Sequence, residues 1–418
     1  MRRSITALVV GGLALLASLL AFAPVHAQQP PARPALPFPP DWAQLEGFKV
    51  FADKGCGGCH AVRGFGPTVG PDLGRSQGLR SFFGVAAAMW NHLPRMGAQM
   101  REARVERARL TPGEASNLVA FLFTAQYQDE LGDPKSGETL FTSKGCAKCH
   151  ALAGRGGLVG PALDRLKNVN SPVIVAAAMW NHGPQMAEAM AAVAAPRPTF
   201  EAQELLDLIA HVTEAARDPG APTQQIVPGT PERGRRLFAD KKCAACHAVG
   251  GQGPRVGPDL GRPGHHVSLT AFAARMWNHA PAMAEKMRER KIEVPKLSGQ
   301  EMADVLAYLY VSRYFEPAPS TARGRQLVQD KGCTTCHSVA GKGGKAGADF
   351  ATSSVVRTPA GLVAGMWNHS RLMEAAAQKR EVAWPMLTGP ELGDIAAYLT
   401  SLPRPGAGIP APPKPGAK

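Results

Sequence analysis

The sequence Cys243-Ala-Ala-Cys246-His247 belongs to a pattern of two cysteines and a histidine that occurs four times in this 418-residue chain and predicts its fold. The other copies are Cys56-Gly-Gly-Cys59-His60, Cys146-Ala-Lys-Cys149-His150 and Cys333-Thr-Thr-Cys336-His337. Together these motifs use all eight cysteines, so no thiol remains for a structural disulfide. Other features of the sequence stand at fixed distances from each motif histidine.

The pattern CxxCH is the attachment sequence of c-type haem. Two thiols at this spacing can form thioethers with the two vinyl groups of one haem, and the adjacent histidine then faces the iron. Zinc sites and redox dithiols also use CxxC, so a single match would be weaker evidence. Four matches with the same histidine predict four covalently attached haem c groups. Their proximal iron ligands would be His60, His150, His247 and His337.

The chain is an internal repeat whose spacing does not vary. Thirteen residues before each motif histidine stands a glycine, and sixty-one residues after it an aromatic side chain or His211. A glycine in a helix allows a neighbouring helix to cross closely, so we expect these two positions to meet, with His211 as a packing residue rather than a ligand. The glycines are Gly47, Gly137, Gly234 and Gly324, and the later residues are Phe121, His211, Tyr308 and Tyr398.

The repeats predict an all-α fold of four tandem domains, each a small helical bundle around one haem. The predicted domains are residues 44–132, 133–222, 228–317 and 318–403, with a Pro-rich linker at 28–43 and a disordered tail at 404–418. Each domain reads as a helix that enters the CxxCH turn, a loop, a helix, a short helix and a final amphipathic helix. The prolines Pro94, Pro184 and Pro281 are predicted to end the middle helix and start the short one.

This arrangement resembles the class I c-type cytochromes, here four in tandem over roughly residues 44–403. In that family a loop proline's carbonyl accepts a hydrogen bond from the proximal histidine and orients its ring. The resemblance assigns this role to Pro71, Pro161 and Pro258, each within Gly-Pro-x-Leu. The fourth copy reads Gly347-Ala-Asp-Phe350 and lacks the proline, so we expect its haem loop and redox potential to differ.

The distal iron ligand has more than one candidate in every copy. Each repeat carries Met-Trp-Asn-His and then a second methionine four residues further on. We favour the second methionine, because it resembles the family's distal ligand and a thioether raises the redox potential. These residues are Met96, Met186, Met283 and Met373. The open alternative is the motif's histidine, at His92, His182, His279 and His369, which would give bis-His haems of lower potential.

The methionine and the tryptophan of the Met-Trp-Asn-His motif can also be interpreted as core residues. The methionines before tryptophan are Met89, Met179, Met276 and Met366, and a methionine in an alanine-rich helix is more often a core residue than a ligand. The tryptophans are Trp90, Trp180, Trp277 and Trp367. We expect them to pack on the haem edge, or else to lie between two helices as ordinary core residues.

The N-terminus predicts export from the cytoplasm. Arg2 and Arg3 precede an apolar stretch from Ile5 to Pro24, and Val25-His26-Ala27 resembles a cleavage site, so residues 1–27 read as a signal peptide for the periplasm. An uncleaved membrane anchor is the alternative, and membrane contact is expected only in that case. The net charge is +14, and the lysines and arginines that carry it are scattered along the chain. This pattern favours acidic redox proteins as partners and not nucleic acid.

Four alike, six-coordinate haems indicate an electron carrier that passes single electrons between redox partners outside the cytoplasm. An enzyme would need an open iron or a distinctive residue set at one haem. Only the fourth copy departs from the others, so a multihaem redox enzyme with an open fourth haem is the alternative.

Overall fold

The computed structural model describes residues 42–76, 79, 81–127, 129–166, 171–216, 229–262, 268–314 and 319–403. All of them belong to one compact unit, Leu36–Lys418. The predicted signal peptide and C-terminal tail lie outside the described residues. Among the helices that are described, none is both long and apolar enough to cross a membrane.

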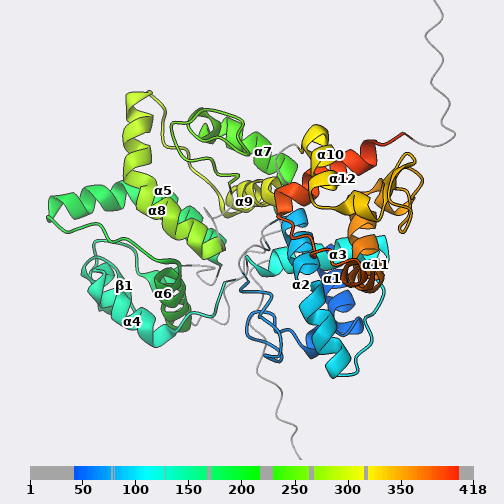
Figure 1. Ribbon diagram of the computed structural model, residues 1–418. Helices are drawn as coiled ribbons and strands as arrows, with labels where there is room; N and C mark the ends of the chain where they lie inside the picture. The colour runs from blue at the N-terminus through cyan, green and yellow to red at the C-terminus, as the bar shows by residue number, and fades with distance from the viewer. Residues whose placement is uncertain are drawn as a thin grey trace, which may run out of the picture. The chain divides into compact units, whose positions relative to one another are not determined.

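Each repeat contains three α-helices, and the all-α prediction is confirmed (Figure 1). The first helices of the repeats are α1 (Trp42–Asp53), α4 (Pro134–Ser143), α7 (Pro231–Asp240) and α10 (Thr321–Asp330). The long middle helices are α2 (Phe82–Glu102), α5 (Pro172–Ala192), α8 (Leu269–Glu289) and α11 (Pro359–Lys379). The last helices are α3 (Pro112–Ala125), α6 (Ala202–Ala215), α9 (Gly299–Tyr314) and α12 (Gly389–Ser401). We refer to these sets as repeats 1 to 4.

The remaining regular structure lies in the loops. Two short antiparallel hairpins pair β1 (Ala151–Leu152) with β2 (Arg155–Gly156), and β3 (Ser338–Val339) with β4 (Lys342–Gly343). Short 3₁₀ turns, η3 (Leu163–Arg165) and η6 (Val355–Arg357), precede the middle helices of repeats 2 and 4. These elements belong to the segments that follow the CxxCH motifs of repeats 2 and 4.

The first and last helices of each repeat cross at the predicted glycine. A Cβ atom on Gly234 would lie 1.9 Å from the carbonyl oxygen of Asp304 and 2.8 Å from the Cβ of Tyr308. The Asp304 side chain is 2% exposed; it accepts a hydrogen bond from the backbone N–H of Thr230 at 2.8 Å and pairs with Arg233. Gly47, Gly137 and Gly324 meet the last helix in the same way, so the expected close crossing is confirmed in all four repeats.

The predicted helix break at the three prolines is wrong, because α2, α5 and α8 each continue through theirs. A proline inside a helix has no N–H for the carbonyl four residues earlier. Side chains from other repeats bond two of these carbonyls. Trp384 Nε1 donates to the carbonyl of Trp90 at 3.2 Å, and Arg197 Nη2 donates to the carbonyl of Trp277 at 3.4 Å. The candidate histidine and methionine, four residues apart, therefore share one face of a continuous helix.

The repeats pack in two pairs, 1 with 4 and 2 with 3. Helix α2 contacts α11 and α12, and α11 contacts α3. Helix α5 lies beside α8 and also contacts α9, while α8 contacts α6 (Figure 1). One hydrophobic core contains residues of repeats 1 and 4 together, including Val119 and Leu392. The other is shared by repeats 2 and 3, including Val173 and Met302. Each small domain thus gains core volume from a partner that is not always its neighbour in sequence.

Candidate functional site

The cysteine pairs lie on one tight turn in every repeat. The turns are the 3₁₀ helices η1 (Cys56–Gly58), η2 (Cys146–Lys148), η4 (Cys243–Ala245) and η5 (Cys333–Thr335). All eight thiols are free and half-buried. Burial raises the pKa of Cys56, Cys146 and Cys333, and it raises that of Cys243 to about 11, so these thiols are neutral at pH 7. The two thiols of each motif lie on one turn beside the motif histidine, which is the placement that attachment of a single haem requires.

The proximal histidine has a fixed ring orientation in all four repeats. The Nδ1 atoms of His60, His150 and His247 lie 2.9–3.0 Å from the carbonyl oxygens of Pro71, Pro161 and Pro258. A carbonyl only accepts, so Nδ1 carries the proton and Nε2 keeps a lone pair free for iron. This is the arrangement that the resemblance implied.

The fourth repeat keeps this hydrogen bond without the proline. His337 Nδ1 lies 2.9 Å from the carbonyl oxygen of Ala348. The accepting group belongs to the backbone, so exchanging proline for alanine leaves the acceptor in place. The expectation that this loop differs therefore finds no support in the orientation of the histidine.

The loop glycine before that residue allows the imidazole to pack directly on the backbone. A Cβ atom on Gly257 would lie 2.5 Å from Cε1 of His247, and the distances for the other three repeats are 2.4 or 2.5 Å. The same glycine's N–H donates to the carbonyl of the second motif cysteine at 2.7–2.8 Å. Any larger residue would push the ring out of its position. The glycine of Gly-Pro-x-Leu is therefore required by the histidine.

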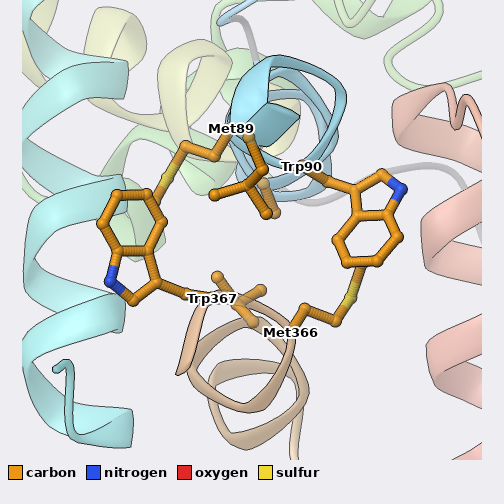
Figure 2. A pocket seen from close by; sticks show the side chains of 7 residues that line it. Met89, Trp90, Met366 and Trp367 are labelled. Atoms are coloured by element: carbon orange, nitrogen blue, oxygen red, sulfur yellow. The ribbon is translucent and has the colours of Figure 1, made fainter. Parts of the chain in front are cut away.

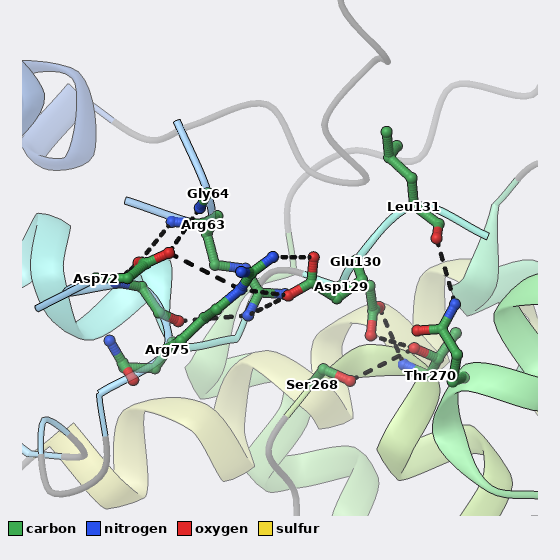
Figure 3. Close-up of polar contacts among 12 residues, drawn as sticks. Arg63, Gly64, Asp72, Arg75, Asp129, Glu130, Leu131, Ser268 and Thr270 are labelled. Atoms are coloured by element: carbon green, nitrogen blue, oxygen red, sulfur yellow. Dashed lines mark hydrogen bonds and ion pairs between the residues drawn. The ribbon is translucent and has the colours of Figure 1, made fainter. Parts of the chain in front are cut away.

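An aspartate closes the loop in repeats 1, 3 and 4. Asp72 accepts hydrogen bonds from the backbone N–H groups of Arg63, Gly64 and Gly74 at 2.6–2.8 Å (Figure 3). Burial acts to raise its pKa, but these three donors outweigh burial and lower it. Asp259 and Asp349 make the equivalent bonds, and both pKa values are also lowered. Repeat 2 has Ala162 at this position. Sequence reasoning missed this role, although the aspartate stands twelve residues after the motif histidine in three copies.

These residues fit a covalently held haem. Two thiols and one imidazole lie on adjacent positions of one turn, and the imidazole presents an unprotonated Nε2. Within the described ranges, no group of three or more His, Cys, Asp or Glu side chains is placed to hold a metal ion. The cysteine pair and histidine of each motif would attach and ligate the haem, which supplies the one-electron chemistry when bound.

The two distal-ligand candidates differ in their surroundings. Met96, Met186, Met283 and Met373 are all half-buried and pack against the hydrophobic cores. The candidate histidines are exposed in all four repeats. In three of them Nδ1 bonds the helix's own carbonyl four residues earlier, as in His279 with Arg275 at 2.9 Å. The structure thus places both sets on the same helix, with the methionines nearer the core.

The tryptophan and asparagine of Met-Trp-Asn-His bind the paired repeat. Trp277 Nε1 donates to the carbonyl of Pro198 at 2.7 Å, and Asn278 exchanges two hydrogen bonds with the backbone of Phe200 at 2.9 and 3.0 Å. Repeat 2 makes the equivalent bonds to repeat 3: Trp180 donates to the carbonyl of Pro295, and Asn181 exchanges two hydrogen bonds with the backbone of Leu297. We call this the reciprocal Trp–Asn contact.

Repeats 1 and 4 make the reciprocal Trp–Asn contact in the same way. Trp90 and Asn91 bind the backbone of Pro385 and Leu387, and Trp367 and Asn368 bind that of Ala108 and Leu110. Between α2 and α11, Met89 points toward Trp367 and Met366 toward Trp90 in a small apolar pocket (Figure 2). These side chains thus lie between two helices and pack on the shared core, while their packing on the haem edge stays a prediction.

A further position supports the contact and was not singled out from sequence. Forty-seven residues after the motif histidine, repeats 1, 2 and 4 carry Arg107, Arg197 and Trp384. The Arg197 guanidinium lies 3.5 Å from the ring centre of Trp277, and Trp384 stacks on Trp90 with ring centres 4.1 Å apart. Each therefore covers the tryptophan of the paired repeat.

A protein-family model described as Cytochrome c matches residues 134–216, 231–311 and 321–403. These ranges are repeats 2, 3 and 4, and together they cover more than half of the chain. The chain belongs to the cytochrome c family. No curated protein and no solved structure matches it. Repeat 1 lies outside the matched ranges of this cytochrome c, yet it has the same turn, the same Nδ1–carbonyl bond and the same crossing of first and last helices. Repeated cytochrome c domains imply haem-based electron transfer.

Proposed function

We propose that this cytochrome c carries four covalent haem c groups and passes single electrons between redox partners outside the cytoplasm. The observation that carries the proposal is the repetition of one complete site. All four repeats combine the CxxCH turn, the Nδ1–carbonyl bond and the glycine under the imidazole. Four sites built alike suit electron carriage, because an enzyme would need a distinctive set of residues at one haem.

We propose the methionine set as the distal ligands. Half-burial and packing on the core favour Met96, Met186, Met283 and Met373 over the exposed histidines. A buried thioether that completes the coordination keeps water and other ligands from the iron and favours a high potential. The histidine on the same helix face would then hydrogen-bond to groups around the haem or to solvent.

The enzyme alternative loses one of the two observations that favoured it. Repeat 4 was its candidate because the loop proline is missing there and because Ala377 stands where the other copies carry Met100, Met190 and Met287. Ala348 supplies the same carbonyl to His337, and Met373 occupies the same position as the other distal candidates. Repeat 4 is therefore proposed to carry electrons like the rest.

We propose the periplasm as the location and acidic redox proteins as partners. Residues 1–27 support the location through their signal-peptide pattern, and c-type cytochromes generally function outside the cytoplasm. The chain's net charge of +14 supports the partner class. Lys342 and Lys345 are exposed on the haem loop of repeat 4, where a docking carboxylate surface would meet them.

A spectroelectrochemical titration of the purified holo-protein tests the proposal. We expect four haems per chain, one electron per haem, and no binding of carbon monoxide to the reduced protein, because every iron has six ligands. A haem that binds carbon monoxide at once, or a high-spin ferric signal, would favour an enzyme instead.

A further inference from the structure

The contacts between repeats do not follow the order of the repeats in the chain. Repeats 1 and 4 share one hydrophobic core and repeats 2 and 3 share the other. The reciprocal Trp–Asn contact occurs in both pairs, with each repeat using the same positions as its partner. Each pair is thus built like an isologous dimer, in which one surface binds a copy of itself.

A second kind of contact connects the two pairs. The last helices α3 and α9 meet through Phe123, Tyr127, Tyr310 and Tyr314, which we call the aromatic junction. The ring centres of Tyr127 and Tyr310 are 3.8 Å apart, and those of Phe123 and Tyr314 are 4.8 Å apart. Three of the chain's five tyrosines lie here, which makes the junction its densest aromatic cluster in the described residues.

A polar contact lies beside the aromatic junction. The carboxylate of Asp129, just after α3, accepts a hydrogen bond from the backbone N–H of Thr270 at 3.1 Å and another from that residue's hydroxyl (Figure 3). Thr270 is fully buried in the first turn of α8. A carboxylate at a helix N-terminus also interacts favourably with the helix dipole. Repeat 1 therefore contacts repeat 3 through both its last helix and the segment that follows.

The sequence explains why the aromatic junction joins repeats 1 and 3. The junction residues stand sixty-three and sixty-seven positions after the motif histidine in repeats 1 and 3. Repeats 2 and 4 have Thr213 and Thr400 at the first of these positions, and both repeats carry arginine at the second. Threonine and arginine have no aromatic ring with which to form a contact of this kind. Only repeats 1 and 3 therefore carry the aromatic side chains that the junction requires.

We infer that electrons pass among the four domains in the order in which the domains contact one another, 4–1–3–2, rather than in their order along the chain. This inference rests on the proposed electron-carrier function. Each transfer moves one electron from a reduced domain to an oxidised neighbour, and no bond forms or breaks. In the part of the chain that the structure describes, the aromatic junction and the Asp129–Thr270 contact connect repeat 1 of one pair to repeat 3 of the other, so we place repeats 2 and 4 at the ends of the series. External partners would then meet the domains of repeats 2 and 4.

Local photoreduction of the full-length holo-protein tests this order. A ruthenium photoreductant is attached to a cysteine introduced by Lys345→Cys, on the exposed haem loop of repeat 4, so that electrons enter there. The test variant combines Phe123→Thr with Tyr310→Thr. It copies the residue that repeats 2 and 4 carry at this position, so a folded helix is expected. The matched control places the photoreductant by Arg255→Cys on repeat 3.

In the protein with the unchanged junction, light should reduce all four haems from either label, and the absorbance should change without a separate slow phase. In the junction variant, half of the total absorbance change should become slow from both labels, because two haems lie beyond the junction. Hydrogen exchange should rise at the ends of α3 and α9 and stay unchanged at the loops of the reciprocal Trp–Asn contact. If the variant shows this exchange pattern and all four of its haems are still reduced at the original rate, the proposed order of electron transfer is wrong.

Failure of the carrier function would look different. If light reduces only the labelled domain with the junction intact, electrons do not pass between domains and the proposed function fails. If hydrogen exchange shows wider unfolding in the double variant, Tyr310→Thr alone replaces it, because that change removes the ring contacts of Tyr310 with Phe123 and Tyr127 and keeps the other junction residues. A slow phase of half the amplitude supports the order in this variant, and an unchanged course contradicts it.

Discussion

Asn278→Ala removes one half of the reciprocal Trp–Asn contact between repeats 2 and 3. Asn278 accepts from the backbone N–H of Phe200 at 3.0 Å and donates to its carbonyl at 2.9 Å. Phe200 is 6% exposed, so both backbone groups would lose their partner in a buried place. Each unsatisfied group costs about 1–3 kcal/mol. Because water partly replaces the lost partner, we expect Asn278→Ala to reduce the local stability of this contact by about 2–4 kcal/mol.

Amide hydrogen exchange with peptide-level mass spectrometry measures this loss where it occurs. Because 1.4 kcal/mol corresponds to a factor of ten, the amide of Phe200 should exchange roughly 30- to 700-fold faster. The matched control is Asn368→Ala, which removes the same bonds from Leu110 in the other pair. Each variant should affect only its own pair. Equal changes in both pairs, or no change at Phe200, would refute the reciprocal pairing.

Further predictions concern the haem sites and the helix crossing. Gly257→Ala should displace His247, since the added Cβ would lie 2.5 Å from its ring, and one of four haems should lose its normal optical spectrum. Met283→Ala should change the ligation of one haem, whereas Met276→Ala should change none. Asp304→Ala should speed exchange in α7 by roughly tenfold or more, and Asp304→Asn much less, because an amide oxygen can still accept the N–H of Thr230. Lowered pKa values mean that Asp72, Asp259 and Asp349 stabilise their loops at neutral pH and lose this effect as acid protonates them. Exchange measured below about pH 4 should therefore rise in these three loops before it rises in repeat 2.

Much of each domain could be predicted from fixed spacing. The motif histidine, the crossing glycine and the sixty-first residue kept their intervals in all four copies, and intervals of this kind report contacts within one repeat. The proline carbonyl was also predictable from the family resemblance. Ala348 was not, because the sequence shows a missing ring and not the backbone carbonyl that stays.

The pairing of repeats could not be predicted from the same intervals. Trp277 and Pro198 keep fixed positions relative to their own motifs, and nothing in that spacing says that they belong to a shared contact between different repeats. The continuity of α2 and α8 also depends on contacts from another repeat. Pro94 would normally weaken α2, but the carbonyl that it leaves without an N–H is bonded by Trp384 from another repeat. A helix break was a sound expectation for an isolated domain and was wrong for a paired one.

The optical spectrum of the fully oxidised holo-protein, with haem and protein measured in the same sample, tests the central claim most directly. Methionine–iron(III) coordination gives a weak far-red charge-transfer band that bis-histidine coordination lacks. The account predicts four haems per chain and a band of the strength expected for four methionine-ligated haems. Four haems without this band would contradict the assignment of Met96, Met186, Met283 and Met373, and fewer than four haems would contradict the equivalence of the repeats.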